Sequence, residues 1–274
     1  MIQYPPYPGI AGSLQQLTEA VVAAKPFTHI RLNDGEFLTM FGDTPNQKLG
    51  DGCRMFRSMG DALIQSFREV LSRPKAETFI GSYWINPLYH PDAEYNQGID
   101  LFTRYVIQNG LEADVSDTRW LAGDFWYSTS AEREGIVDGG EELLDLFAVV
   151  KNRAKYVPVV LVGNEQIACV RHCLDAHFIR VPRVDCWNLR PDIIGWCREY
   201  AQNNALFVWC AGVAAKAIAV DISRVYPKTS HLDFGSVFDG VVGDCSRMWL
   251  ERRSGPHWDF LQQRIVPYVL GKNE

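Results

Sequence analysis

Two carboxylates separated by one glycine stand near the start of the sequence. Asp34, Gly35 and Glu36 follow an expected strand that begins at Phe27, and the glycine lets the backbone turn tightly between the two acids. Carboxylate oxygens are hard ligands that suit Mg²⁺ or Mn²⁺, ions that bridge the diphosphate of a nucleotide. The same three residues are also typical of an ordinary Asp-Gly turn with an N-capping role, so the spacing alone leaves both interpretations open.

A second segment passes from an apolar run into small residues and then to a lysine. Ala211 and Gly212 follow residues 208–210, and Lys216 falls in the first turn of the helix expected next. Backbone N–H groups and the helix dipole can face an anion there, and Lys216 would add a charge to a phosphate. The spacing matches neither the P-loop nor the Gly-x-Gly-x-x-Gly fingerprint. Small residues would equally allow close packing of the helix on a sheet.

A third segment, the strand expected at residues 230–234, also ends in acids and a glycine. Asp233 and Asp239 are therefore candidates for a general base that accepts the proton of an attacking hydroxyl, or for groups that bind sugar hydroxyls. Asp124, further back in the chain, is a weaker candidate. A surface turn rich in Asp and Gly would look the same.

Short β-branched or aromatic runs alternate with longer stretches of helical period, which is typical of an α/β protein. We expect strands at residues 27–33, 77–82, 156–162, 178–181, 205–210 and 230–234. We expect helices at residues 14–24, 57–71, 99–109, 141–153, 165–176, 191–203, 214–225 and 257–270. The expected fold is a Rossmann-like, mainly parallel sheet with helices on both faces. Such sheets bind ligands beyond the carboxyl ends of their strands, where the three segments above and Gly163 all fall.

The chain has no repeat, low-complexity tract or convincing linker, so we expect one α/β domain over residues 1–274. Residues 83–140 are richest in aromatic and loop residues, and they predict an insertion or lid over one end of the sheet. Trp84, Trp120 and Trp126 in this stretch could stack on a sugar or a base, although most tryptophans serve packing.

Composition restricts the class of protein. The 274 residues are 47% hydrophobic, enough for a sizeable core, and the formal net charge of −6 gives no general attraction to nucleic acid or anionic membranes. The first residues do not show the basic segment followed by an apolar run that is typical of a signal peptide, and no uncharged apolar stretch is long enough to span a membrane. The seven cysteines show no regular pairing, which suits reduced thiols. We therefore expect a soluble, cytoplasmic protein with no membrane span.

In their order along the chain, these segments resemble the GT-D class of bacterial glycosyltransferases, whose members carry an Arg-x-Gly-Asp-Gly-Glu-like motif after the first strand. Residues 31–36 read Arg-Leu-Asn-Asp-Gly-Glu, so Asn33 replaces the first glycine while the Asp-x-Glu core is intact. The resemblance continues in the family's order through residues 159–163, 182–188, 211–216 and 232–235. It implies the GT-D fold and a nucleotide-sugar-dependent glycosyltransferase.

The resemblance also implies a role for each matching position. Asp34 and Glu36 would engage a Mn²⁺ or Mg²⁺ ion and the nucleotide-sugar, and Gly212 and Lys216 would border its diphosphate. The other positions assigned to the donor site are Arg31, Asn33, Gly163, Asn188 and Ala211. The Gly-Pro that usually follows the fifth strand in the family is Gly212-Val213 here, a departure in the phosphate-binding loop.

The implied reaction moves a sugar from a nucleotide diphosphate sugar, with a UDP-sugar expected, to an acceptor hydroxyl. The metal would neutralise the leaving diphosphate as the anomeric bond breaks. Two acceptors stay open: a glycan, or a hydroxymethylated base in DNA as in phage-type enzymes, so the enzyme would act in a bacterial cytoplasm whether encoded by the bacterium or by a phage. A non-catalytic nucleotide-binding or interaction module of the same fold is the alternative from another class.

Overall fold

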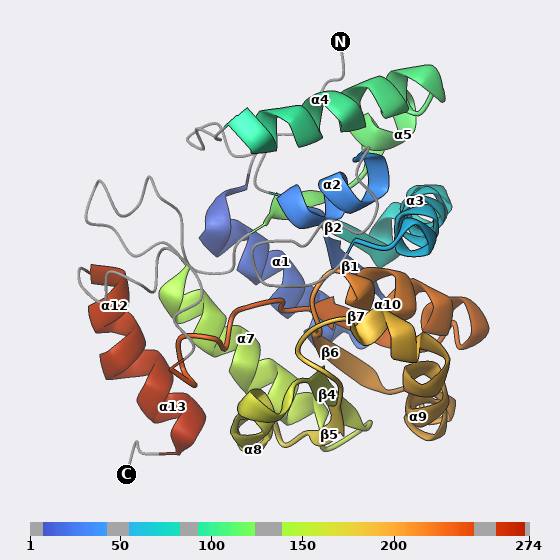
Figure 1. Cartoon of the computed structure of the whole chain (residues 1–274). Helices are drawn as coiled ribbons and strands as arrows, with labels where there is room; N and C mark the ends of the chain where they lie inside the picture. The colour runs from blue at the N-terminus through green and yellow to red at the C-terminus, as the bar shows by residue number, and fades with distance from the viewer. Residues whose placement is uncertain (1–7, 43–54, 83–92, 124–138, 244–255, 272–274) are drawn as a thin grey trace.

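The computed structural model describes residues 8–42, 55–82, 93–123, 139–243 and 256–271. Within these ranges, the side chains of Asp34, of residues 93–99 and of residues 256–257 are not described. In the described part of the chain, helices pack on a sheet that runs through the centre of the molecule (Figure 1).

Seven parallel strands form this sheet in the order β3-β2-β1-β7-β6-β4-β5. The strands are β1 (Thr28–Arg31), β2 (Thr78–Ser82), β3 (Trp120–Ala122), β4 (Val159–Gly163), β5 (His177–Arg180), β6 (Leu206–Cys210) and β7 (Ser230–Asp233). β1 and β7 come from opposite ends of the chain but are neighbours, with Thr28 opposite His231. Because every strand is parallel, all carboxyl ends meet at one edge, and the predicted α/β class is confirmed.

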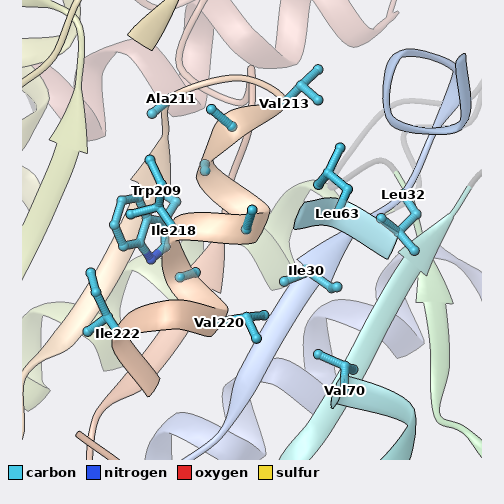
Figure 2. Close-up of a cluster of buried hydrophobic side chains, with 14 of the residues drawn as sticks. Ile30, Leu32, Leu63, Val70, Trp209, Ala211, Val213, Ile218, Val220 and Ile222 are labelled. Atoms are coloured by element: carbon cyan, nitrogen blue, oxygen red, sulfur yellow. The ribbon is translucent and has the colours of Figure 1, made fainter. Parts of the chain in front are cut away.

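Helices on one face cover a cluster of buried side chains centred on β1 and β6. They are α2 (Asp34–Phe41), α3 (Arg57–Ser72), α4 (Ala93–Gln108), α5 (Glu112–Asp117), α9 (Arg190–Gln202) and α10 (Ala214–Val225). Met59, Leu63, Phe67 and Val70 of α3 are buried at helical spacing, which turns one stripe of this helix to the sheet. Figure 2 shows this cluster, in which α3 and α10 lie together over Ile30 of β1.

The opposite face carries a second buried cluster, to which β4, β6 and β7 also contribute. Its helices are α1 (Gly9–Ala23), α7 (Gly140–Arg153), α8 (Arg171–Leu174), α12 (Pro256–Phe260) and α13 (Val266–Leu270). Strands β1, β2, β3 and β4 are buried along their whole length. Burial of this kind is expected of parallel strands that are covered on both faces, and in β1 it includes the polar side chains of His29 and Arg31.

Several elements differ from the sequence-based expectations, among them the short helix α5, which was not expected. Residues 34–36 form the first turn of α2 rather than a free turn, and the short strand β3 was not expected. The single helix expected at 165–176 is the 3₁₀ turn Glu165–Val170 followed by α8, and the π-helical turn Leu261–Ile265 joins α12 to α13. In each of the last two cases the apolar period is right, but the hydrogen-bond pattern changes along the segment.

The predicted insertion at 83–140 is described only in part. Its described residues supply α4, α5 and β3. β3 pairs with β2, α4 and α5 join the core of the first face, and the rest of the segment lies outside the described residues. Trp120 is buried and its indole Nε1 donates to the carbonyl of Val115 at 2.8 Å, so it serves packing rather than stacking on a ligand. None of the helices in the described ranges combines the length and apolarity needed to cross a bilayer.

Candidate functional site

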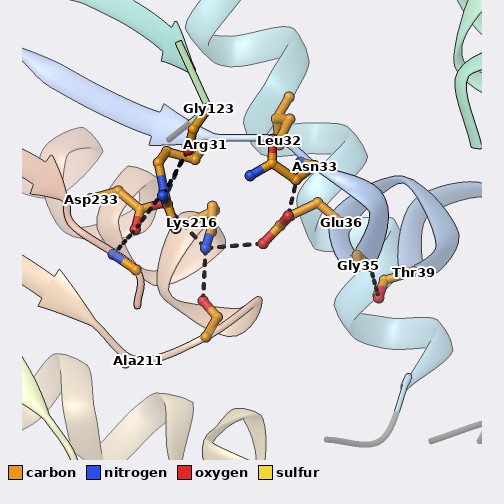
Figure 3. Close-up of polar contacts among 12 residues, drawn as sticks. Arg31, Leu32, Asn33, Gly35, Glu36, Thr39, Gly123, Ala211, Lys216 and Asp233 are labelled. Atoms are coloured by element: carbon orange, nitrogen blue, oxygen red, sulfur yellow. Dashed lines mark hydrogen bonds and ion pairs between the residues drawn. The ribbon is translucent and has the colours of Figure 1, made fainter. Parts of the chain in front are cut away.

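The carboxyl ends of β1 and β7 place an arginine beside an aspartate. The backbone N–H of Arg31 donates to Asp233 Oδ2 at 3.1 Å, and the guanidinium Nε lies 3.9 Å from Asp233 Oδ1. The arginine also donates from Nη1 to the carbonyl of Gly123, just after β3, at 2.7 Å. Figure 3 shows how these contacts tie the ends of the three strands together.

Lys216, in the first turn of α10, points inward between two carboxylates (Figure 3). Its ammonium Nζ lies 3.0 Å from Glu36 Oε1, 3.2 Å from Asp233 Oδ2 and 3.0 Å from the carbonyl oxygen of Gly212. Only 3% of the residue is exposed. Burial by itself lowers the pKa of Lys216. The negative charges of Asp233 and Glu36 raise it by more than burial lowers it, so the pKa lies above the ordinary value and the ammonium stays charged.

Glu36 closes the other end of this cluster through the start of α2. Asn33 is the N-cap of that helix, and its backbone N–H donates to Glu36 Oε2 at 2.9 Å in a capping-box arrangement. Since Oε1 faces Lys216, each oxygen of the carboxylate has its own partner. Arg31, Asp233, Lys216 and Glu36 therefore form a buried chain of alternating charges, which we call the strand-end cluster.

Gly235 follows β7 where only a glycine fits. Its φ is +53°, and a Cβ on it would lie 1.6 Å from a guanidinium nitrogen of Arg31. Its N–H donates to Asp233 Oδ1 at 3.0 Å. The glycine between the two acids of this segment thus gives Arg31 room beside Asp233, a reason that the spacing in the sequence does not show.

The two candidate bases differ in their surroundings. Burial raises the pKa of Asp233, but the charges of Lys216 and Arg31 lower it more, so the net pKa is below its ordinary value. Both oxygens of Asp233 also accept hydrogen bonds or ion pairs, which argues against its predicted role as general base. Asp239 is half-buried beyond β7 and stays a candidate.

The remaining predicted donor residues spread over the same edge of the sheet. Gly163 ends β4 beside Cys210, and a Cβ on it would collide with Ile167, so it serves close packing. The carbonyl of Ala211 accepts from the Cys186 thiol at 3.2 Å. Gly212 has a φ of +63° and open space around it.

Asn188 is exposed in the 3₁₀ turn Cys186–Leu189. The structure brings Arg31, Asn33, Gly212, Glu36, Lys216 and Asp233 together, and the donor roles of all the predicted residues stay predictions.

His29 is not among the residues predicted from the sequence, although it lies in β1 two residues before Arg31 and is fully buried. Burial is the main cause that lowers the pKa of His29 to about 3, with Asp233 opposing and Arg31 and Lys216 adding to the shift, so the imidazole is neutral. Residues i and i+2 of a strand lie on the same face, so the spacing of His29 and Arg31 was the pattern in the sequence that places them side by side. Gly123 was missed because only its backbone takes part.

Two hollows lie apart from the strand-end cluster. One, of about 320 Å³, lies between the end of α2 and the start of α3, and the other, of about 470 Å³, lies between β5 and α9. Neither is lined by Arg31, Glu36, Lys216 or Asp233. A ligand at the strand ends would therefore approach the cluster outside both hollows.

The metal that the resemblance implies can be tested against these contacts. No group of three or more His, Cys, Asp or Glu side chains in the described part of the chain could hold a metal ion. Glu36, the described member of the predicted pair, has an ammonium on one oxygen and a backbone N–H on the other. The described side chains therefore do not fit a metal bound to Glu36. The side chain of Asp34 lies outside the described residues, as do Asp124, Trp84 and Trp126.

Comparisons with known proteins add the fold. No family model matches the sequence, and no curated protein matches it. The chain is similar to a solved structure of domain of unknown function 1792, which is described as having a distinct glycosyltransferase fold. The TM-score is 0.54 at 15% identity, over 92% of this chain and 83% of that chain.

It is also similar to a glycosyltransferase (DUF1792) from Streptococcus sanguinis, with a TM-score of 0.54 at 16% identity, over 93% of this chain and 86% of that chain. A selenomethionine structure of the same domain of unknown function matches at 15% identity with a TM-score of 0.54. The chain thus has the α/β fold of these structures, and the predicted GT-D fold is confirmed.

Proposed function

We propose that this chain is a glycosyltransferase that moves a sugar from a nucleotide diphosphate donor, a UDP-sugar being expected, to an acceptor hydroxyl. The observation that carries the proposal is the fold, which matches a structure described as a glycosyltransferase fold over 92% of this chain. The acidic strand ends support it, since they lie at the edge where open α/β sheets bind ligands.

The donor diphosphate is proposed to lie at the N-terminus of α10. The backbone at Gly212 is open, because no heavy atom beyond its two chain neighbours lies within 4 Å of the position that a Cβ would take. The start of a helix of this length carries a partial positive charge and unpaired N–H groups, both of which favour an anion. Ala211 and Gly212 would border the diphosphate, with Arg31, Asn33, Gly163 and Asn188 the further candidates for donor contacts along the same edge.

Asp239 is the proposed general base. It would take the proton of the acceptor hydroxyl as the oxygen attacks the anomeric carbon and the bond to the diphosphate breaks. Burial is the main cause that raises the pKa of the Cys210 thiol, and the charges of Asp233 and Asp239 add to it, which supports a position of Asp239 near the ends of β6 and β7. No step of the proposed reaction is assigned to a metal, because the described side chains do not fit one at Glu36.

The test is a screen of nucleotide-sugar donors for release of the nucleoside diphosphate, followed by mass analysis of a glycan acceptor and of hydroxymethylated DNA. The mass gained by one acceptor or the other decides between the two classes. Asp239→Asn should lower the transfer rate by about 10²- to 10⁴-fold. The control is Asp259→Asn, an exposed carboxylate on α12.

Tight binding of a nucleotide-sugar without transfer to any acceptor would contradict the proposal and favour a non-catalytic binding module. Transfer that is equally fast in Asp239→Asn and in the control would remove the general base but leave the glycosyltransferase assignment standing.

A further inference from the structure

The ammonium of Lys216 occupies a position bounded by oxygen atoms. Glu36 Oε1, Asp233 Oδ2 and the carbonyl oxygen of Gly212 lie 3.0, 3.2 and 3.0 Å from Nζ. An ammonium has three N–H donors, so these oxygens can satisfy all of them. Two of these oxygens belong to carboxylates, and carboxylate oxygens are ligands that hard divalent cations prefer.

A divalent cation at Glu36 would compete with this lysine. Mg²⁺ binds oxygen at about 2.0–2.1 Å and requires near-octahedral geometry. An ion on Oε1 would lie beside the ammonium, and like charges at such a distance repel strongly at a buried site. The other oxygen is bound by the N–H of Asn33, and only 6% of Glu36 is exposed. A metal bound to Glu36 thus requires Lys216 to leave its position.

The charge balance supports the same conclusion. Arg31 and Lys216 supply two positive charges to the strand-end cluster, and Glu36 and Asp233 supply two negative charges. The cluster is therefore already neutral. Removal of the ammonium would leave an excess negative charge and two carboxylate oxygens that face one point.

We infer that Lys216 takes the place of the divalent cation at Glu36, so that this chain binds and uses its nucleotide-sugar without a metal ion on that carboxylate. The inference deepens the proposed function and rests on it for the part that concerns the donor. The part that concerns the cation rests on the contacts alone.

The test titrates Mn²⁺ into the protein without donor and measures bound ion by electron paramagnetic resonance. We expect Glu36→Gln to leave any Mn²⁺ binding by the wild type unchanged. We expect Lys216→Met to bind Mn²⁺ at least ten-fold more tightly than the wild type, and the double variant Lys216→Met/Glu36→Gln to lose this gain. Lys75→Met, which removes an exposed lysine paired with Asp117, is the control and should gain nothing.

Saturable Mn²⁺ binding by the wild type that Glu36→Gln weakens ten-fold or more would overturn the inference, and this comparison stands even if Lys216→Met does not fold. A second measurement compares donor turnover with excess chelator and with Mn²⁺. Equal rates, or a Mn²⁺ dependence that Glu36→Gln leaves unchanged, support the inference, whereas a chelator-sensitive rate that depends on Glu36 overturns it. If no donor is used under any condition, the proposed function fails, and the Mn²⁺ titrations still decide which cation Glu36 binds.

Discussion

Asp233→Asn tests how much the strand-end cluster contributes to folding. Asp233 is 2% exposed and faces two cations, with Lys216 Nζ at 3.2 Å and Arg31 Nε at 3.9 Å. Asparagine has the same shape but no charge, so both cations stay buried without this anion. Its NH₂ must also replace one oxygen, and either position then faces an N–H donor, from Arg31 or from Gly235.

The expected cost follows from these contacts. Loss of one partner from a buried ion pair destabilises a protein by about 3–5 kcal/mol. With about 2–4 °C per kcal/mol for a large domain, the midpoint of thermal unfolding should fall on the order of 10 °C.

The difference should also depend on pH, because the surroundings lower the pKa of Asp233 below its ordinary value of 3.8. A carboxyl with a lowered folded pKa stabilises the protein above the unfolded pKa, and this stabilisation is lost as the pH falls through the folded pKa. The variant should therefore differ fully from the wild type at neutral pH and progressively less below about pH 4.

Urea unfolding of both proteins between neutral and acid pH measures these effects. The matched control is Asp117→Asn, because Asp117 Oδ2 lies 2.8 Å from Lys75 Nζ but the two side chains are 67% and 56% exposed. Such a surface pair contributes about 1 kcal/mol or less. If Asp233→Asn costs no more than Asp117→Asn at neutral pH, the buried charges of the cluster do not stabilise the fold more than a surface ion pair does.

Two further substitutions test other parts of the sheet. Gly235→Ala should lower the unfolding midpoint more than Gly243→Ala, since both glycines have positive φ but only the first has Arg31 in the path of a Cβ; equal shifts would contradict the close approach. Burial is the main cause that lowers the pKa of His231 from 6.5 to about 3 in the folded protein. As the pH falls below 6.5, His231 takes up a proton in the unfolded chain but not in the folded one, so this residue lowers the free energy of unfolding by about 1.4 kcal/mol per pH unit. His231→Gln should remove that share of the slope in urea titrations, and an unchanged slope would show that His231 titrates normally.

Two central strands could be predicted closely. The expected strands at 205–210 and 230–234 match β6 (Leu206–Cys210) and β7 (Ser230–Asp233), and β6 shows the unbroken apolar stretch that is typical of a strand covered on both faces. β3 has only three residues, too few to show a period. α2 was missed although Asn33 and Glu36 have the spacing of a capping box, a signal that predicts a helix start.

The partners of the charged residues could not be predicted in the same way. Lys216 meets Glu36 and Asp233 only because β1 lies next to β7 and α10 packs over both strands. The order of strands in a sheet is set by long-range packing, which one sequence without relatives does not reveal. A lysine in the first turn of a helix is therefore compatible with an outward phosphate contact and with an inward ion pair, and only the fold separates the two.

The acidic segment that begins α2 illustrates how one pattern serves two kinds of chemistry. A carboxylate after a parallel strand can bind a metal or an ammonium, and the group that faces it decides between them. Here the facing group is Lys216, which is 3% exposed. If its ammonium moved away from Glu36, the buried carboxylate of Asp233 would also lose its ion pair with the lysine. Any ion that displaced the lysine from Glu36 would therefore also have to offset the loss at Asp233, which favours the lysine in this chain.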